Sequence, residues 1–137
     1  MFATSLLLSV AAAVSSAQDF ACPAELPASA IAVTHAPAGW TGFVPTRLLL
    51  HDVGLGTGPL EDRATLVGEH RKLGRGAFTV TYGALRGWDK RDRWLMCKYG
   101  EGNDIVVAKR LPGGIDQCSV AYTPDKWGGN NIKIACR

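Results

Sequence analysis

Four cysteines constrain this chain more than any other feature of its sequence: Cys22, Cys97, Cys118 and Cys136. No two of them have the short Cys-x-x-Cys spacing that closes a tetrahedral zinc site, so we expect no metal centre. An even number of cysteines in a small exported chain is typical of disulfides formed in an oxidising compartment. The cysteines therefore predict a small fold cross-linked by two disulfides.

The N-terminus predicts export. An apolar run from Leu6 to Val14 is followed by the small residues Ser15 and Ala17, a pattern typical of a signal peptide cleaved after Ala17. The run is too short to span a bilayer, so we expect no stable membrane insertion. Asp19 stands where a lipoprotein signal needs an aliphatic residue, which argues against a lipid anchor on Cys22. We expect a signal peptide over residues 1–17 and one disulfide-stabilised β domain over 18–137, in a periplasmic or secreted protein.

Short apolar and alternating segments recur along the chain, separated by Gly, Pro, Asn and Asp. Leu60, Ala64 and Val67 have a helical spacing after Pro59, so we expect a short helix within 60–73. The Gly54–Gly58 region is expected to be a turn before this helix. The sum is a mainly β fold of about seven strands with at most one short helix, in a small antiparallel β-sandwich or partly open barrel. The expected strands are 22–36, 47–55, 77–82, 94–99, 105–111, 118–122 and 132–136.

The last two predicted strands indicate a register. If Val120 faces Ile134 in an antiparallel hairpin, Tyr122 faces Ile132 and Cys118 faces Cys136, because side chains on a strand alternate with period two. Directly opposed cysteines can form a disulfide, which leaves Cys22 to pair with Cys97. The rival pairing, Cys22 with Cys136 and Cys97 with Cys118, stays open from the sequence.

Residues that could carry catalysis or bind a cofactor are sparse. His35, His51 and His70 lack a metal-ligand spacing, and His51 and Asp52 are adjacent strand residues that point to opposite faces. There is no Gly-x-Ser-x-Gly motif, and the glycines at 54–58 lack the lysine of a phosphate-binding loop. We therefore predict no enzyme and no cofactor. A net charge of +3 is too small to predict nucleic-acid binding, and Arg71, Lys72 and Arg75 are interpreted as a solvated turn.

Four tryptophans divide by context. Trp94 is expected to pack beside Met96, and Trp40 to cover the core. Trp88 and Trp127 lie in polar loops, and aromatic and charged residues in loops often form binding hot spots. An alternative is that each tryptophan folds back over the end of a sheet. The predicted partner-binding residues are Asp125, Lys126 and Trp127 in one loop, and Trp88 and Arg91 in another.

Several short motifs occur in a fixed order along the chain: Cys22-Pro23, Gly39-Trp40, Gly58-Pro59, Trp94 to Tyr99, Leu111-Pro112 followed by Cys118 to Tyr122, and Ile134 to Arg137. This framework resembles a family of small exported proteobacterial proteins, most of them uncharacterised, some of which are encoded near type VI secretion loci. The resemblance implies a periplasmic immunity protein.

We therefore expect a non-enzymatic periplasmic binding protein, an inhibitor or immunity protein whose partner is a secreted toxin or an envelope enzyme. A small cell-envelope hydrolase or a ligand carrier is the alternative. A bound small molecule in native mass spectrometry would favour that alternative.

Overall fold

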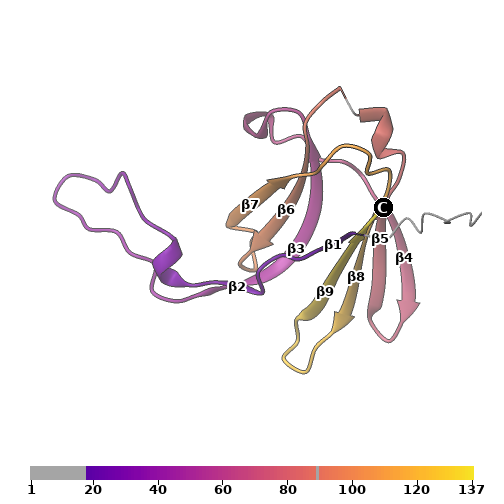
Figure 1. Ribbon diagram of the computed structural model, residues 1–137. Coiled ribbons are helices and arrows are strands. Elements are labelled where there is room, and N and C mark those ends of the chain that lie inside the picture. Colours follow the sequence, from indigo (N-terminus) through magenta and orange to yellow (C-terminus); the bar gives the residue numbers. More distant parts are fainter. Residues whose placement is uncertain (1–17, 89) are drawn as a thin grey trace, which may run out of the picture.

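Two antiparallel sheets face each other in the computed structural model, which describes residues 18–88 and 90–137. Figure 1 shows the β4, β5, β8 and β9 strands on one side of the molecule and the β3, β6 and β7 strands on the other. The expected mainly β, sandwich-like fold is confirmed. The predicted signal peptide and its cleavage site after Ala17 lie outside the described residues.

The first sheet has the strand order β1-β9-β8-β5-β4. The Val120–Ile134 register predicted from the sequence is confirmed, with Cys118 opposite Cys136. The alternating segment at 77–82 forms β5 as predicted. The strands of this sheet are β1 (Gln18–Phe20), β4 (Glu69–Gly74), β5 (Ala77–Tyr82), β8 (Cys118–Pro124) and β9 (Asn130–Cys136).

The second sheet has the order β2-β3-β6-β7. Its strand β3 continues through Gly54 and Gly56, where the sequence indicated a turn. Glycine is used here for close packing and not for a turn. A Cβ at Gly56 would lie 3.0 Å from the carbonyl oxygen of Ala64, so glycine permits the close approach of the segment that contains Ala64. The strands are β2 (Glu25–Leu26), β3 (Leu48–Thr57), β6 (Arg93–Tyr99) and β7 (Ile105–Arg110).

The core fills the space between the sheets. Alternate residues of β3 and β6 face alternate residues of β8 and β9 across it, as the period-two rule requires. Trp94 lies on the other face of β6, partly buried, and its Nε1 donates a hydrogen bond to the Gly58 carbonyl at 2.8 Å. The buried core residues include Val53, Leu55, Leu95, Val120, Tyr122 and Ile134.

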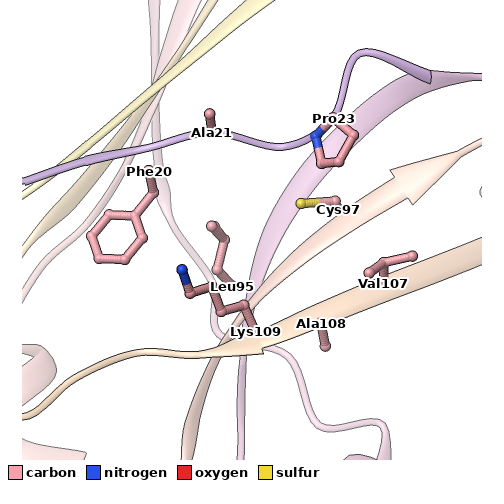
Figure 2. Close-up of a pocket in the computed structure, with 8 residues that line it drawn as sticks. All are labelled: Phe20, Ala21, Pro23, Leu95, Cys97, Val107, Ala108 and Lys109. Atoms are coloured by element: carbon pink, nitrogen blue, oxygen red, sulfur yellow. The ribbon is translucent and has the colours of Figure 1, made fainter. Parts of the chain in front are cut away.

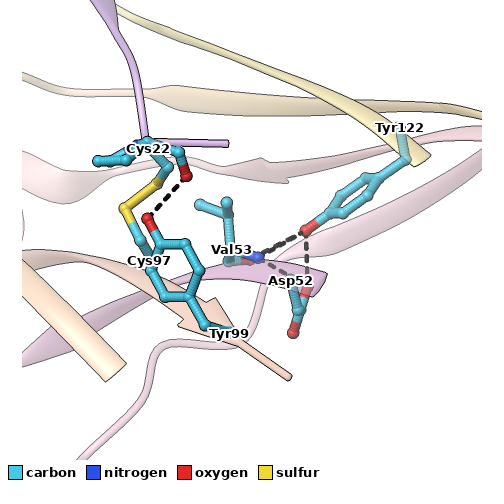
Figure 3. Close-up of a disulfide and its surroundings, with 7 residues drawn as sticks. Cys22, Asp52, Val53, Cys97, Tyr99 and Tyr122 are labelled. Atoms are coloured by element: carbon cyan, nitrogen blue, oxygen red, sulfur yellow. Dashed lines mark hydrogen bonds between the residues drawn. A yellow bond between two sulfur atoms is a disulfide. The ribbon is translucent and has the colours of Figure 1, made fainter. Parts of the chain in front are cut away.

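Both disulfides follow the pairing that the register favoured. Cys118–Cys136 joins opposed residues of β8 and β9, and Cys22–Cys97 ties the N-terminal segment to β6. Beside the second bridge, the Tyr99 hydroxyl donates a hydrogen bond to the Pro23 carbonyl at 2.8 Å (Figure 3). The rival pairing is therefore wrong.

The helix predicted within 60–73 is wrong beyond its first turn. A 3-10 helix, η2 (Leu60–Asp62), ends at Arg63 in a left-handed conformation, and residues from Glu69 onward form β4. Pairing with the free edge of β5 satisfies the backbone groups of this segment, whereas a helix would gain little because Val67, on its expected apolar face, is 96 % exposed. The other 3-10 helices are η1 (Ala28–Ala30) and η3 (Leu85–Trp88).

The strand predicted over 22–36 is also wrong, apart from the two residues of β2. Residues 27–46, which we call the arm, leave the sheets after β2 and return to β3, and they project away from both sheets in Figure 1. The alternation of Ile31, Val33 and His35 finds no strand to pair with. Trp40, expected to cover the core, is 75 % exposed on this arm.

No helix within the described part of the chain has the length and apolar character needed to cross a membrane.

Candidate functional site

The loop that joins β8 to β9 presents Trp127 to solvent. The Asp125 carboxylate accepts hydrogen bonds from the backbone N–H groups of Trp127, at 2.8 Å, and Gly129, at 2.9 Å, which closes the loop. Trp127 is 83 % exposed and does not fold back onto the sheet. The Lys126 ammonium lies 5.0 Å from the centre of its ring. The loop therefore holds an aromatic ring and a cation outward on a fixed backbone.

The second predicted loop contains Trp88 at the end of η3. Trp88 is 40 % exposed, and its carbonyl accepts a hydrogen bond from the backbone N–H of the exposed residue Arg91 at 2.8 Å. Leu85, at the start of η3, is buried, and its backbone N–H binds the Asp116 carbonyl. This turn is thus packed on the core at one end and open at the other.

The structure places the two loops at opposite ends of the five-stranded sheet. Tyr82, which precedes η3, pairs with Cys118 at the disulfide end of β8, whereas Trp127 follows Pro124 at the other end. Figure 1 shows η3 and the β8–β9 tip far apart. Seven strand residues at about 3.3 Å each separate the loops by roughly 20 Å. They are therefore two separate surfaces.

A basic turn lies beside the Trp127 loop. Phe78 pairs with Tyr122, so the turn between β4 and β5 comes next to the end of β8 that leads to Trp127. Arg75, exposed in that turn, adds a cation to the one supplied by Lys126. Arg71 and Lys72, interpreted with Arg75 as a solvated turn, lie in β4 instead, and all three residues are exposed. This end of the sheet combines an aromatic ring with positive charge.

A cavity of about 310 Å³ between the sheets is the place where ionisable groups gather, among them Asp52, Lys98, His70, Tyr82 and Tyr122. The Tyr122 hydroxyl donates a hydrogen bond to Asp52 Oδ1 at 2.7 Å, and Lys98 Nζ lies 3.5 Å from Asp52 Oδ2. Burial raises the pKa of Tyr122 well above its ordinary value, and the hydrogen bond to Asp52 raises it further. Burial, and then the charge of Asp52, raise the pKa of Tyr82. Both carboxylate oxygens thus have partners, and both tyrosines stay protonated near neutral pH.

The three histidines lie apart. His51 sits at a β-bulge, where its Nδ1 lies 3.2 Å from Asn103 Oδ1, while Asp52 contacts Tyr122 and Lys98. His70 stacks on Phe78, with 4.7 Å between ring centres, and His35 lies on the arm. Among the described residues, no group of three or more His, Cys, Asp or Glu side chains could hold a metal ion.

A second cavity, of about 570 Å³, separates residues 20–23 from β6 and β7. In Figure 2 the Phe20 ring and the Lys109 amine face each other across its mouth, and the ammonium nitrogen lies 5.9 Å from the ring centre. Leu95, Cys97 and Val107 line its floor. It is an apolar hollow with one cation at its rim, which suits an apolar side chain better than a reacting substrate.

The sequence reasoning missed the arm as an exposed surface. Trp40 and Phe43 both point away from the core, and Phe43 is 77 % exposed. The available signal was the absence of any Asp, Glu, Lys or Arg over residues 27–46, and this stretch was read instead as strand and loop.

Comparison with known protein families gives a match. A family model described as "Type VI secretion system Tli immunity protein" matches residues 45–137, more than half of the chain and the whole of both sheets from β3 onward. Comparisons with curated proteins and with solved structures gave no match.

Proposed function

The chain belongs to the type VI secretion system Tli immunity protein family, and from this membership we propose that it is a non-enzymatic periplasmic protein that binds and blocks a toxin directed at the cell envelope. The match over residues 45–137 carries this proposal. It links the chain to type VI secretion and to immunity, and an immunity protein acts by binding its toxin.

Two further observations support a periplasmic location. The structure contains two disulfides, Cys22–Cys97 and Cys118–Cys136, and such bonds persist in oxidising compartments. The apolar run ending near Ala17 has the form of a cleavable signal. We assign residues 1–17 to that signal and residues 18–137 to the mature domain, whose cysteine framework we attribute to the family as a whole.

The Trp127 loop is our first candidate for toxin contact. Trp127 and Lys126 are presented on a backbone that Asp125 holds closed, so little conformational freedom is lost on binding. Trp88 and Arg91 form the second candidate. Because the two loops lie at opposite ends of the sheet, a standard interface of about 800 Å² per partner is expected to use one of them rather than both.

The test is a pull-down of the mature protein against the products of the genes adjacent to its own. A secreted toxin among them should bind, and deleting the immunity gene should make cells sensitive to that toxin. If no adjacent product binds and the deletion strain stays resistant, the proposal is wrong.

Trp127→Ala then locates the contact. We expect about a 30-fold weaker Kd with an unchanged Tm, because an exposed hot-spot tryptophan contributes to binding and little to folding. Trp88→Ala is the matched control at the opposite end. If Trp88→Ala weakens toxin binding and Trp127→Ala does not, the contact is assigned to the Trp88 loop.

A further inference from the structure

The arm has no side chain that is formally charged at neutral pH. Residues 27–46 contain no Asp, Glu, Lys or Arg, although 20 % of the chain consists of these residues. Val33, Trp40 and Phe43 on this arm are exposed. A monomeric protein gains nothing by holding large apolar side chains in water on a projecting segment, so such a surface indicates a binding partner.

The arm has a defined shape. Its tip is a turn in which the Trp40 N–H binds the Pro37 carbonyl at 2.9 Å, with Gly39 at φ 82°, a conformation that favours glycine. Further back its two limbs touch: a Cβ at Gly42 would lie 2.5 Å from Val33 Cγ1. The arm is therefore a narrow doubled-back projection with Trp40 at its tip.

The backbone of the arm is largely unpaired within the described residues. Over residues 32–46 the bond from Trp40 to Pro37 is the one backbone–backbone hydrogen bond there. Unpaired N–H and C=O groups are very costly in hydrocarbon, which argues against insertion into a membrane. A protein cleft can supply partners for them, as in recognition of extended peptides.

The base of the arm is fixed to the sheets. Glu25 and Leu26 pair with β3, Arg47 Nε lies 3.1 Å from Glu25 Oε2, and the Cys22–Cys97 bridge holds the incoming chain on β6. Figure 3 shows this bridge beside the hydrogen bond from Tyr99. A base held in this way reduces the conformational entropy that the arm loses on binding.

We propose that the arm inserts into an apolar, uncharged cleft of the toxin and determines which toxin the protein neutralises. The proposal rests on the proposed function. The family match begins at residue 45, so it covers both sheets from β3 onward, while residues 27–44 of the arm lie outside it. An uncharged arm on a chain of net charge +3 fits an apolar cleft better than an acidic groove.

The experiment measures binding of the mature protein to the toxin encoded beside it, by titration calorimetry. Trp40→Ala and Phe43→Ala should each raise Kd about 30-fold, with unchanged Tm because both side chains are exposed. Val67→Ala is the control, since Val67 is a still more exposed apolar residue, at 96 %, and lies off the arm. The loss should be the same at low salt and at 0.5 M salt, where the Debye length is only about 4 Å, because the arm carries no charge to be screened.

A second variant replaces residues 31–44 by a short Gly-Ser linker, which leaves β2, β3 and both disulfides in place. It should keep the wild-type Tm and lose toxin binding. If this variant and the Trp40→Ala/Phe43→Ala double variant both bind as the wild type does, the arm proposal is overturned while the immunity function stands. If the wild type itself binds no toxin, the proposed function fails and the arm proposal fails with it.

Two other binding partners of the arm would give different experimental results. Flotation of the wild type with vesicles of phosphatidylethanolamine and phosphatidylglycerol, lost in the double variant, would mean that the arm binds a membrane. A wild-type dimer in analytical ultracentrifugation that becomes a monomer in the double variant would mean that it binds a second copy of this chain. Either result overturns the proposal.

Discussion

Tyr122 links the two sheets through a polar contact between β8 and β3. Its ring is buried on β8 and stacks on Phe78, while its hydroxyl reaches β3, 2.7 Å from Asp52 Oδ1 and 3.0 Å from the Val53 carbonyl. The Val53 N–H donates to the same hydroxyl oxygen at 3.2 Å (Figure 3). Because these contacts join residues far apart in the chain, they hold one sheet in place over the other.

Removing this hydroxyl should destabilise the fold. For Tyr122→Phe we expect a loss of about 1–2 kcal/mol in the free energy of unfolding, since the Phe ring keeps the packing and the hydrogen bonds are lost. Urea unfolding measures it. Thr123→Ala, at an exposed position on the same strand, should leave the midpoint unchanged. A Tyr122→Phe protein with the wild-type midpoint would show that the bridge is not stabilising.

Stability should also fall at alkaline pH. Burial raises the pKa of Tyr82, Tyr99 and Tyr122 in the folded state, so near pH 10 the unfolded chain releases protons that the folded protein retains. The unfolded state therefore binds fewer protons, and the free energy of unfolding decreases as pH rises above about 10 while staying flat below about 9. Urea midpoints from pH 7 to 11 test this. Tyr122→Phe should make the alkaline decline shallower, and an equal decline would contradict this assignment.

Arg93 is a buried cation that organises one end of the molecule. Its guanidinium donates hydrogen bonds to the carbonyls of Leu85, Ile115 and Pro112, at 3.2, 2.7 and 3.2 Å. Arg93→Met should cost about 3 kcal/mol, because buried carbonyls lose a charged donor. Arg91→Ala, exposed two residues earlier, should change stability by less than about 0.5 kcal/mol. Similar urea midpoints for Arg93→Met and Arg91→Ala would show that Arg93 does not stabilise this end of the molecule.

Among the elements, the two disulfides should contribute unequally. Cys22–Cys97 spans 75 residues and Cys118–Cys136 spans 18. Loop-closure entropy predicts that Cys22→Ser/Cys97→Ser costs about 4.5 kcal/mol and Cys118→Ser/Cys136→Ser about 3 kcal/mol. Urea unfolding of the two double variants compares them. A larger cost for the Cys118–Cys136 pair would show that local strain or packing outweighs chain entropy.

The strands that the sequence predicted correctly are those whose pattern matches their environment. In β8 buried residues alternate with half-buried ones, and in β5 Phe78, Val80 and Tyr82 pack in or against the core, so apolar and polar residues alternate along both strands. The helix within 60–73 and the strand within 22–36 were wrong because periodicity says nothing about whether a partner edge is present. β5 offered an edge to β4, and none is paired with the arm beyond β2.

At the scale of the whole molecule, function should depend on export. Deleting residues 2–17 should abolish protection against the toxin, because the protein would stay in a reducing compartment away from its partner. The measurement is the survival, in the presence of the toxin, of a gene-deletion strain that carries either the full-length gene or the form lacking residues 2–17. A different cleavable periplasmic signal in place of residues 1–17 should restore protection. Full protection by the leaderless form would contradict a periplasmic site of action.

The candidate site was only partly predictable. The sequence indicated that Trp88 and Trp127 lie in loops, and both are exposed. It did not show that they lie at opposite ends of a sheet, since that depends on the pairing of β5 with β8. It also predicted that Trp40, in an early loop, would cover the core, whereas the side chain is 75 % exposed on the arm.

What the sequence determined by itself is local or depends on simple counting: the number of cysteines, the β character, and a hairpin register that favoured the Cys118–Cys136 pairing but left the rival pairing open. Side-chain alternation and opposed cysteines suffice for these, because each depends on neighbouring residues along two adjacent strands. Only the tertiary structure shows which segments pair with the edge of a sheet, where the Trp88 and Trp127 loops lie, and that residues 27–46 project from the sheets. Those outcomes depend on pairing between distant segments, which no local pattern encodes.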